Sequence, residues 1–285
     1  KTPTIIALVK ALAARGIKAG IVSRGYGGRA QRYPLEVRYD TDVTHCGDEP
    51  KLLALELHSL DCPIVVAPNR VAAVEYLLAL TDVNIVLSHD GLQHYAMHRD
   101  LEIVLIDGVR GLGNGHTLPA GPLREPVERL LEVDSVLING EADIPSVCAD
   151  GRIGLQPRVF RHLASNKTVA AADWQESRVV HGVAAIGNPE RFAASLESLG
   201  LQVLLHGKDD HQPLGPSDLE YADQLPVIIT GKDAVKLSGP LPDNLWVLDV
   251  EMVLDGVFVD DFVAKAGLVA LCAPTDRSAI NDSQD

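Results

Sequence analysis

The sequence predicts an α/β protein in which a mainly parallel sheet carries helices on both faces. Short runs rich in Ile, Val and Leu alternate with helical patterns through the first half of the 285 residues, which is typical of strands joined by crossover helices. A second alternation of the same kind begins near residue 179. A hydrophobic content of 46% with 22% charged residues is ordinary for a globular chain, and the length suffices for one large or two smaller domains.

The elements of the first half follow one another closely. Apolar residues at three- and four-residue spacing predict helices, and short β-branched runs predict strands. The predicted helices cover residues 4–15, 51–58 and 70–80, and the predicted strands cover residues 19–23, 63–67, 84–88 and 101–106. In open α/β sheets ligands bind outside the carboxyl ends of the strands, so we expect the loops after these strands to converge on one crevice.

A second, smaller α/β unit is predicted after residue 178. Its strands are expected over residues 179–186, 202–205 and 226–230, and its helices over residues 189–199 and 217–224. Residues 146–178 lose the alternation and indicate a connecting region with some β character. The predicted division is therefore a core over residues 1–145, a linker over 146–178, a second unit over 179–272 and a polar tail over 273–285.

Charge and cysteine content argue against several functions. The chain has 39 acidic and 25 basic residues, a net charge of −14, whereas proteins that bind duplex nucleic acid need clustered Lys and Arg to displace counterions. We therefore expect no nucleic-acid partner. The 4 cysteines are scattered and form no C-x-x-C pair, so neither a zinc knuckle nor a disulfide framework is indicated. No apolar stretch reaches the roughly 18 to 20 residues that would span a bilayer.

The first two residues, Lys1 and Thr2, stand before an apolar helical run in the order that ends a phosphate-binding loop. In the motif G-x-x-x-x-G-K-[ST] the lysine reaches the β- and γ-phosphates, the hydroxyl binds magnesium, and the helix start faces the anion. The glycines of such a loop are absent, so this interpretation implies a chain truncated at its N-terminus. The alternative is that Lys1 and Thr2 are an arbitrary surface dipeptide. When the pair is considered alone, this alternative is favoured.

A glycine-rich loop follows the strand predicted over residues 19–23. Residues 23–28 read Ser-Arg-Gly-Tyr-Gly-Gly, and glycines permit close approach of the backbone to a ligand. Arg24 would add a rigid, bidentate clamp for a phosphate. A plain Gly-rich turn is an equally good interpretation of this segment.

A histidine-rich loop with an aspartate follows the strand predicted over residues 84–88. Its Asp90 stands where a phosphoryl-transfer enzyme keeps the carboxylate that holds magnesium. One alternative is a zinc site of His89, His94 and His98, which is disfavoured because no cysteine joins them and a glycine interrupts any shared helical face. Another alternative is that each histidine is simply solvated at the end of a strand.

Further segments could supply acid–base chemistry or bind phosphate. Asp48 stands at the start of a predicted helix, where it could act as a base or simply cap the helix. Asp210 and His211 form a potential pair, because a neighbouring carboxylate orients an imidazole, although Asp209 beside them also fits a hydrated turn. Residues 230–236 offer two lysines to a phosphate or form a solvated helix start.

Taken in order along the chain, these segments resemble one known family. The segments are Lys1-Thr2-Pro3 and residues 22–28, 47–50, 90–95, 118–125, 210–212 and 230–236. Together they resemble tetraacyldisaccharide 4′-kinase, the lipid A kinase, over nearly the whole chain. No single motif identifies the family, but their shared order is very improbable by chance.

The resemblance implies a P-loop NTPase-like core, a smaller α/β domain and a β-linker between them. It implies a kinase that uses ATP and Mg²⁺ to phosphorylate the 4′-hydroxyl of a tetraacylated glucosamine disaccharide 1-phosphate, giving lipid IVA. It places the full-length protein at the cytoplasmic face of the bacterial inner membrane, with a hydrophobic helix upstream of Lys1. The net charge of −14 fits an anionic membrane poorly, so membrane contact is expected from that upstream segment.

The resemblance also implies roles for individual residues. Lys1 would neutralise the transferring phosphate, and Thr2 and Asp90 would bind Mg²⁺. Asp48, paired with His211, would accept or orient the proton of the attacking sugar hydroxyl. The other residues expected to line the ATP site, with less defined roles, are Arg24, Gln93, His94, Arg124 and Glu125.

The sequence departs from the family pattern at two positions. His89 replaces an aspartate, and magnesium disfavours an imidazole ligand, so His89→Asp is expected to improve magnesium-dependent activity. Gly231 replaces a glutamate whose role the pattern leaves open. Two other functions stay open. One is a different P-loop kinase or GTPase that acts on a soluble metabolite, and the other, suggested by these departures and by the missing loop, is a degenerate nucleotide-binding homologue without catalysis.

Overall fold

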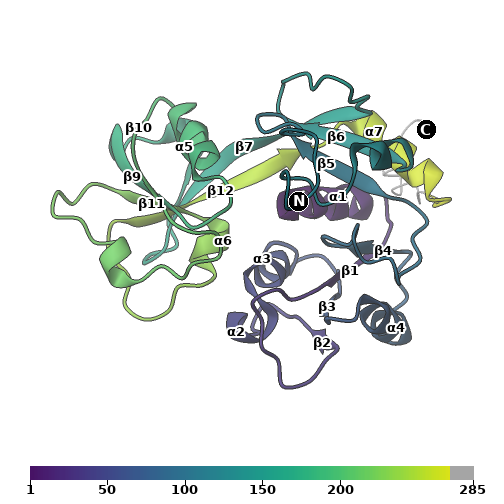
Figure 1. Cartoon of the computed structure of the whole chain (residues 1–285). Coiled ribbons are helices and arrows are strands. Elements are labelled where there is room, and N and C mark those ends of the chain that lie inside the picture. The colour runs from purple at the N-terminus through teal and green to yellow at the C-terminus, as the bar shows by residue number, and fades with distance from the viewer. Residues whose placement is uncertain (270–285) are drawn as a thin grey trace, which may run out of the picture.

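The computed structural model describes residues 1–269 and shows two β-sheets with helices packed against them (Figure 1). One sheet has four strands and the other has eight. The predicted α/β class is confirmed by this arrangement. The polar tail predicted over residues 273–285 lies outside the described residues.

The four-stranded sheet is built from the N-terminal third of the chain. Its strands, in spatial order, are β2 (Leu35–Glu36), β3 (Ile64–Val66), β1 (Ala19–Ser23) and β4 (Ile85–Ser88). β1 runs parallel to β3 and to β4, whereas β2 is antiparallel to β3. Because β1 and β4 are parallel, with Val22 opposite Ser88, the loops that follow them leave the sheet at the same edge.

Helices cover both faces of this sheet. They are α1 (Thr2–Ala13), α2 (Val43–Cys46), α3 (Asp48–Glu56) and α4 (Arg70–Leu80). Ile21 of β1 belongs to the same buried cluster as Leu12 of α1, whereas the next residue, Val22, packs in a cluster with Leu77 of α4. Alternate residues of a strand point to opposite faces, so a strand covered on both sides requires an unbroken apolar run.

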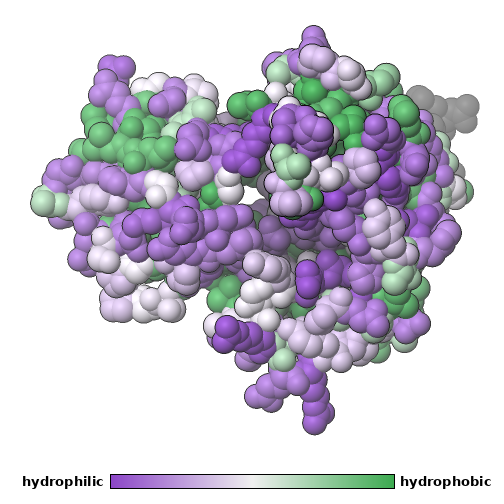
Figure 2. Space-filling view, in the orientation of Figure 1, coloured by the Kyte–Doolittle hydropathy of each residue, from purple (hydrophilic) through white to green (hydrophobic). Residues whose placement is uncertain are grey.

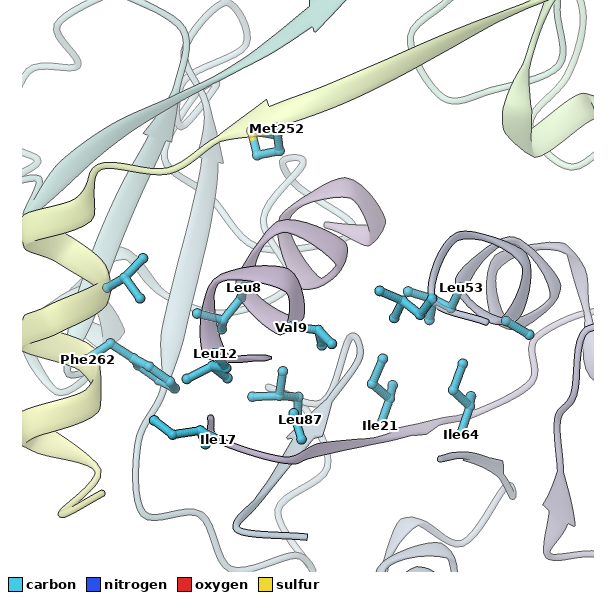
Figure 3. Close-up of a cluster of buried hydrophobic side chains, with 14 of the residues drawn as sticks. Leu8, Val9, Leu12, Ile17, Ile21, Leu53, Ile64, Leu87, Met252 and Phe262 are labelled. Carbon is cyan, nitrogen blue, oxygen red and sulfur yellow. The ribbon is translucent and has the colours of Figure 1, made fainter. Parts of the chain in front are cut away.

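The larger hydrophobic core joins the two ends of the described chain. Figure 3 shows Leu12 of α1 beside Phe262 of the C-terminal helix α7 (Gly256–Lys265), and Val9 on the side of α1 that faces Leu53 of α3. α7 therefore packs on the N-terminal core. The predicted division of the chain remains a prediction, and this packing means that a second unit ending at residue 272 would share its last helix with the first core.

The eight-stranded sheet runs through two parts of the molecule. Its strands, in spatial order, are β10 (Gln202–Gly207), β9 (Val179–Ala184), β11 (Val227–Thr230), β12 (Leu245–Val253), β7 (Gly151–His162), β6 (Ser135–Asn139) and β5 (Ile103–Asp107), with β8 (Thr168–Ala170) paired to β7. The first part contains the four-stranded sheet with β5, β6 and α7, and the second part contains β9, β10, β11, α5 (Pro189–Glu197) and α6 (Gly231–Ala234) (Figure 1). β7 and β12 are long antiparallel neighbours that connect the two parts in Figure 1. The region expected to be a linker with some β character thus contains a 12-residue strand.

The helices of the second half differ from those that the sequence predicts. Besides α7, its helices are α5, α6 and the 3-10 helices η2 (Ala171–Asp173) and η3 (Pro216–Asp218). A further 3-10 helix, η1 (Val127–Leu131), precedes β6. The helix predicted over residues 217–224 is wrong, because only η3 forms there. The Tyr221 ring stacks on His181 of β9 at 3.7 Å between centroids, and Asp223 Oδ1 lies 3.1 Å from His181 Nε2. These contacts hold the segment against the sheet.

Helix length bears on membrane insertion. A helix needs about 20 apolar residues to cross the hydrocarbon core of a bilayer, and α1, at 12 residues, is the longest helix within residues 1–269. No helix in this part of the chain combines the length and the apolar character needed to cross a membrane.

Candidate active site

A groove of about 690 Å³ opens between β4 and β5. The strand predicted over residues 101–106 forms β5, but it pairs with β6 and not with β4, so the groove lies between the two sheets. The predicted site residues that line it are Lys1, Asp90, Gln93, Arg124 and Glu125. Loops after the two strands thus reach one crevice, although the strands belong to different sheets.

Asp90 is held between two cations at the end of β4. Lys1 Nζ lies 2.5 Å from Asp90 Oδ1, and Arg124 Nη1 lies 3.2 Å from Asp90 Oδ2. Partial burial opposes ionisation of this carboxyl, but the two cations outweigh the burial and lower the pKa of Asp90 to about 2. Asp90 therefore offers ionised oxygen atoms at neutral pH.

The backbone at Asp90 adopts a left-handed conformation, with a φ of 51°. A non-glycine residue in this region is uncommon and carries strain of about 1 kcal/mol or more. The next position requires glycine, because a Cβ at Gly91 would clash with Ser88 Oγ. Arg99 Nη1 supports the turn by donating to the carbonyl of Leu92 at 2.8 Å. The turn therefore determines where the Asp90 carboxylate points.

His89 is buried and contacts the hydroxyl of Thr2. Its Nε2 lies 3.1 Å from Thr2 Oγ1, and its Nδ1 lies 3.5 Å from Ser23 Oγ. Burial lowers the pKa of His89, so the imidazole is neutral at physiological pH and each ring nitrogen can share a hydrogen bond with a hydroxyl. His89 therefore positions the Thr2 side chain at the start of α1.

The oxygen atoms of Thr2 and Asp90 fit magnesium better than zinc. Protein zinc sites use three or four Cys, His or carboxylate ligands, and within residues 1–269 no three or more His, Cys, Asp or Glu side chains are arranged to hold a metal ion. The zinc alternative with His89, His94 and His98 is therefore not supported. Magnesium usually takes one or two protein oxygens and completes its octahedron with water and phosphate, a donor set that one hydroxyl and one ionised carboxylate satisfy.

Asp48 and His211 meet between the two parts of the molecule. Asp48 begins α3 and is only 6% exposed, whereas His211 lies between β10 and η3. His211 Nδ1 lies 2.9 Å from Asp48 Oδ2, and the other carboxylate oxygen accepts from the backbone N of Glu49 at 2.8 Å. His211, like Asp90, has a left-handed backbone, with a φ of 65°. Figure 2 shows that the surface between the two parts is hollowed and bordered mainly by hydrophilic side chains.

The glycine-rich loop after β1 packs against the segment that precedes α3. A Cβ at Gly28 would lie 2.6 Å from the carbonyl oxygen of His45, and a Cβ at Gly47 would clash with the carbonyl oxygen of Tyr26. The glycines therefore allow two backbone segments to touch, and the Tyr26 ring lies 5.1 Å from the His211 ring. The sequence suggested that the glycines of residues 23–28 let the backbone approach a ligand. At Gly28 and Gly47 the structure shows instead that the backbone approaches another backbone segment.

The remaining residues predicted for the ATP site differ in their surroundings. Gln93 Nε2 donates to Glu125 Oε1 at 2.7 Å, and Glu125 Oε2 lies 3.3 Å from Arg129 Nε. His94 is half-buried in the turn that follows β4, and Arg24 is exposed directly after β1. The assignment of these residues to ATP remains a prediction.

Two charged residues of the site, Glu49 and Lys232, are absent from the predicted set. Lys232 Nζ lies 3.3 Å from His211 Nε2 and 3.7 Å from Glu49 Oε1. Glu49 Oε2 in turn lies 3.9 Å from His89 Nδ1, so Glu49 bridges the His89 and His211 sides of the site. The acidic doublet of Asp48 and Glu49 at a helix start was a usable signal for Glu49. The lysines of residues 230–236 suggested a phosphate contact or a solvated helix start, and not a contact with His211.

These contacts define a class of protein. The start of α1 supplies a lysine and a hydroxyl, and the end of β4 supplies an ionised carboxylate. Together they provide the charge neutralisation and the magnesium ligands that phosphoryl transfer needs. A carboxylate–imidazole pair beside them can accept a proton from an attacking hydroxyl. The α/β fold with this site is that of a phosphotransferase.

Comparison with known proteins identifies the family. The sequence model of the tetraacyldisaccharide-1-P 4′-kinase family matches residues 1–266, and this chain belongs to that family. It is 47% identical over 251 residues to the tetraacyldisaccharide 4′-kinase of Alkalilimnicola ehrlichii, covering 88% of this chain and 73% of that protein. The corresponding kinases of Nitrosococcus oceani and Azotobacter vinelandii are 45% and 43% identical, over 90% and 95% of this chain and 74% and 80% of theirs.

A solved structure shares the fold. LpxK from Aquifex aeolicus, crystallised in complex with ATP, superposes with a TM-score of 0.73 and 23% sequence identity, covering 93% of this chain and 83% of that chain. At this level of identity the likeness establishes the fold, and it confirms the α/β architecture. The family match confirms the resemblance drawn from the ordered motifs.

Proposed function

We propose that this protein transfers the γ-phosphate of ATP to the 4′-hydroxyl of tetraacyldisaccharide 1-phosphate, forming lipid IVA. Membership of the kinase family over residues 1–266 supports the substrate class. The observation that carries the mechanism is the 2.9 Å contact between His211 Nδ1 and Asp48 Oδ2, because it supplies an oriented proton acceptor. Glu49, the residue after Asp48, connects this pair to Thr2 through His89.

Lys1 and Arg124 are the cations assigned to the phosphoryl group. Both pair with the carboxylate of Asp90, and the phosphates of ATP would compete with that carboxylate for the same two cations. The Thr2 hydroxyl and Asp90 would hold Mg²⁺, which supplies charge neutralisation at the β- and γ-phosphates. His89 contributes by orienting the Thr2 hydroxyl through its buried Nε2.

Asp48 is the group assigned as proton acceptor. Its Oδ1 is held by the backbone N of Glu49 and its Oδ2 by His211, so the carboxylate has one defined orientation. The 4′-hydroxyl would give its proton to this carboxylate while its oxygen bonds to the γ-phosphorus and the bridging oxygen of ADP leaves. Positioning and charge neutralisation account for most of such a rate enhancement, and an acid–base group adds about 10²–10⁴-fold.

The acylated substrate places the reaction at a membrane surface, and we assign the cytoplasmic face of the inner membrane. Three strongly exposed apolar side chains, Val109, Leu118 and Leu131, lie in the connection between β5 and β6 that also carries Arg124. Apolar groups exposed beside a basic residue suit contact with lipid. This supports delivery of the acyl chains near the groove.

The test is a kinase assay with the natural protein that contains this sequence. It would be incubated with γ-labelled ATP, Mg²⁺ and tetraacyldisaccharide 1-phosphate, and the label would be sought in lipid IVA. Asp48→Asn should abolish most of the transfer, whereas Asp61→Asn, on the exposed surface of the same core, should not. Labelling of a soluble acceptor alone would indicate a different kinase, and ATP binding without transfer would indicate a degenerate homologue.

A further inference from the structure

Lys232 occupies the point where both parts of the site meet. It follows β11 as the second residue of α6, and its side chain is 16% exposed. Its Nζ lies 3.0 Å from Asp210 Oδ1 and 3.3 Å from His211 Nε2. It also lies 3.7 Å from Glu49 Oε1 and 3.9 Å from Asp48 Oδ2. One ammonium group thus faces three carboxylates and one imidazole.

The contact with Lys232 determines which nitrogen of His211 carries the proton. An ammonium has three donors and no acceptor, so His211 Nε2 must accept from it. The proton of the neutral ring then lies on Nδ1, which donates to Asp48 Oδ2 at 2.9 Å. The opposite tautomer would place an N–H against the ammonium and a lone pair against the carboxylate, and both contacts would be repulsive.

Lys232 also balances the charges that surround His211. The groups facing the ring are Asp48, Asp210, Lys232 and the aromatic ring of Tyr26, with Glu49 behind the lysine. His211 Nε2 lies 3.7 Å from Asp210 Oδ2. Without the ammonium, the carboxylates of Asp48 and Asp210 would face the ring with no cation between them, and an N–H at Nε2 directed toward Asp210 would become favourable.

The start of α6, which carries Lys232, is held by buried contacts and is tied to the segment that carries His211. The neighbouring Asp233 is fully buried, and its Oδ2 accepts from Thr230 Oγ1 at 2.7 Å and from the backbone N of Ala185 at 3.2 Å. Lys236 pairs with Asp233 Oδ1 at 2.8 Å and donates to the carbonyl of Gln212 at 3.0 Å. The start of α6 and residues 211–212 are therefore tied together by direct contacts.

We propose that Lys232 is a positioning residue that holds His211 as the Nδ1–H tautomer, directed at Asp48. It acts through His211 and is not assigned a contact with substrate. The lysine also spans the two parts of the molecule, because Asp48 and Glu49 belong to α3 whereas Asp210 and His211 follow β10. The kinetic consequence rests on the proposed kinase function, but the tautomer does not.

The tautomer can be measured directly by two-bond ¹H–¹⁵N NMR of the natural protein labelled with ¹⁵N-histidine, with the His211 signals assigned by their loss in His211→Asn. We expect the neutral Nδ1–H pattern in the unaltered protein and in Lys232→Arg. In Lys232→Met we expect a shift to the Nε2–H or doubly protonated pattern. Lys208→Met, which removes a lysine paired with Asp218 in the same part of the molecule, should leave the pattern unchanged.

Kinetics provide the second readout. Lys232→Met should lower kcat by about 10- to 100-fold with little change in KM for ATP, because Asp48 would lose part of its acid–base contribution when His211 no longer orients it. Lys232→Arg should keep most of the kcat. An Nδ1–H pattern that persists in Lys232→Met would overturn the proposal. If the tautomer changes as expected while no site variant, Asp48→Asn included, alters phosphorylation, the kinase assignment fails and the role of Lys232 in orienting His211 stands.

Discussion

His211 Nδ1 lies 2.9 Å from Asp48 Oδ2, although 163 positions separate the two residues in the sequence. Asp48 is fixed to the first sheet by α3, and His211 is fixed to the second sheet by β10. The hydrogen bond therefore forms only when the two parts of the molecule are in contact. A reaction that uses this pair would depend on closure of the site.

His211→Ala is expected to lower kcat by about 10²-fold, because Asp48 would lose the group that orients it. ATP affinity should change less than about twofold, since His211 does not line the groove beside Lys1 and Asp90. Steady-state kinetics together with ATP-binding calorimetry separate these effects. His58→Ala, at an exposed position after α3, is the control, and unchanged turnover in His211→Ala would remove the pair from the mechanism.

His89→Asp is expected to strengthen magnesium binding but to weaken the metal-free fold. The new carboxylate would be buried near Glu49, which lies 3.9 Å from the present ring, and the contact with Thr2 would be lost. We expect a loss of about 1–3 kcal/mol in unfolding free energy without metal, partly recovered with Mg²⁺.

Urea unfolding with and without Mg²⁺, combined with Mg²⁺ titration of activity, tests this substitution. His89→Asn is the matched control, because it has nearly the same size as Asp but no charge, and it should lose stability without the recovery. If His89→Asp shows no greater response to Mg²⁺ than His89→Asn, position 89 does not influence the metal.

Arg124→Met is expected to raise the pKa of Asp90. In the unaltered protein this pKa is about 2, below the ordinary 3.8, so the stabilising contribution of the ion pairs is complete above the ordinary value and disappears as pH falls through about 2. Without Arg124 only Lys1 remains, and the contribution should begin to disappear at higher pH. Carbon-13 NMR titration of the carboxyl group measures this, with Arg158→Met, whose partner is Glu251, as control. An unchanged midpoint in Arg124→Met would contradict the pairing.

Gly47→Ala is expected to cost about 2 kcal/mol or more of unfolding free energy and to reduce activity. Gly47 has a φ of 89°, and a Cβ there would clash with the carbonyl oxygen of Tyr26. Gly239 is the matched control, since its φ is 87° and a Cβ would meet nothing within 4 Å. Gly239→Ala should therefore show backbone strain alone, about 1 kcal/mol. Equal losses in denaturant unfolding would mean that the approach of Tyr26 is not tight.

Elements with strong local signals were predicted well. The helix predicted over residues 70–80 matches α4 at both ends. Its start is fixed by Asn69, which caps the helix and accepts from the backbone N of Val71 at 3.0 Å. The strand predicted over residues 19–23 matches β1, since burial on both faces demands an unbroken apolar run. In both cases the deciding interaction is visible within a few residues.

Elements that depend on remote partners were not predicted. The segment after η3 resembles a helix in sequence, yet Tyr221 and Asp223 contact His181 some 40 residues away, and the helix does not form. The strand pattern of β5 was recognised, but its pairing with β6 and not with β4 depends on strand order. A local pattern contains no information about which neighbour a strand will have.

The sequence by itself determined the α/β class, the family and the residue types that phosphoryl transfer requires, because periodicity and ordered motifs are properties of the chain alone. Only the tertiary structure decided that His89 holds Thr2, that Glu49 joins the two sides of the site, and that Lys232 faces His211. These contacts depend on strand order and on left-handed turns at Asp90 and His211. Such turns are maintained by long-range packing that overrides local preference.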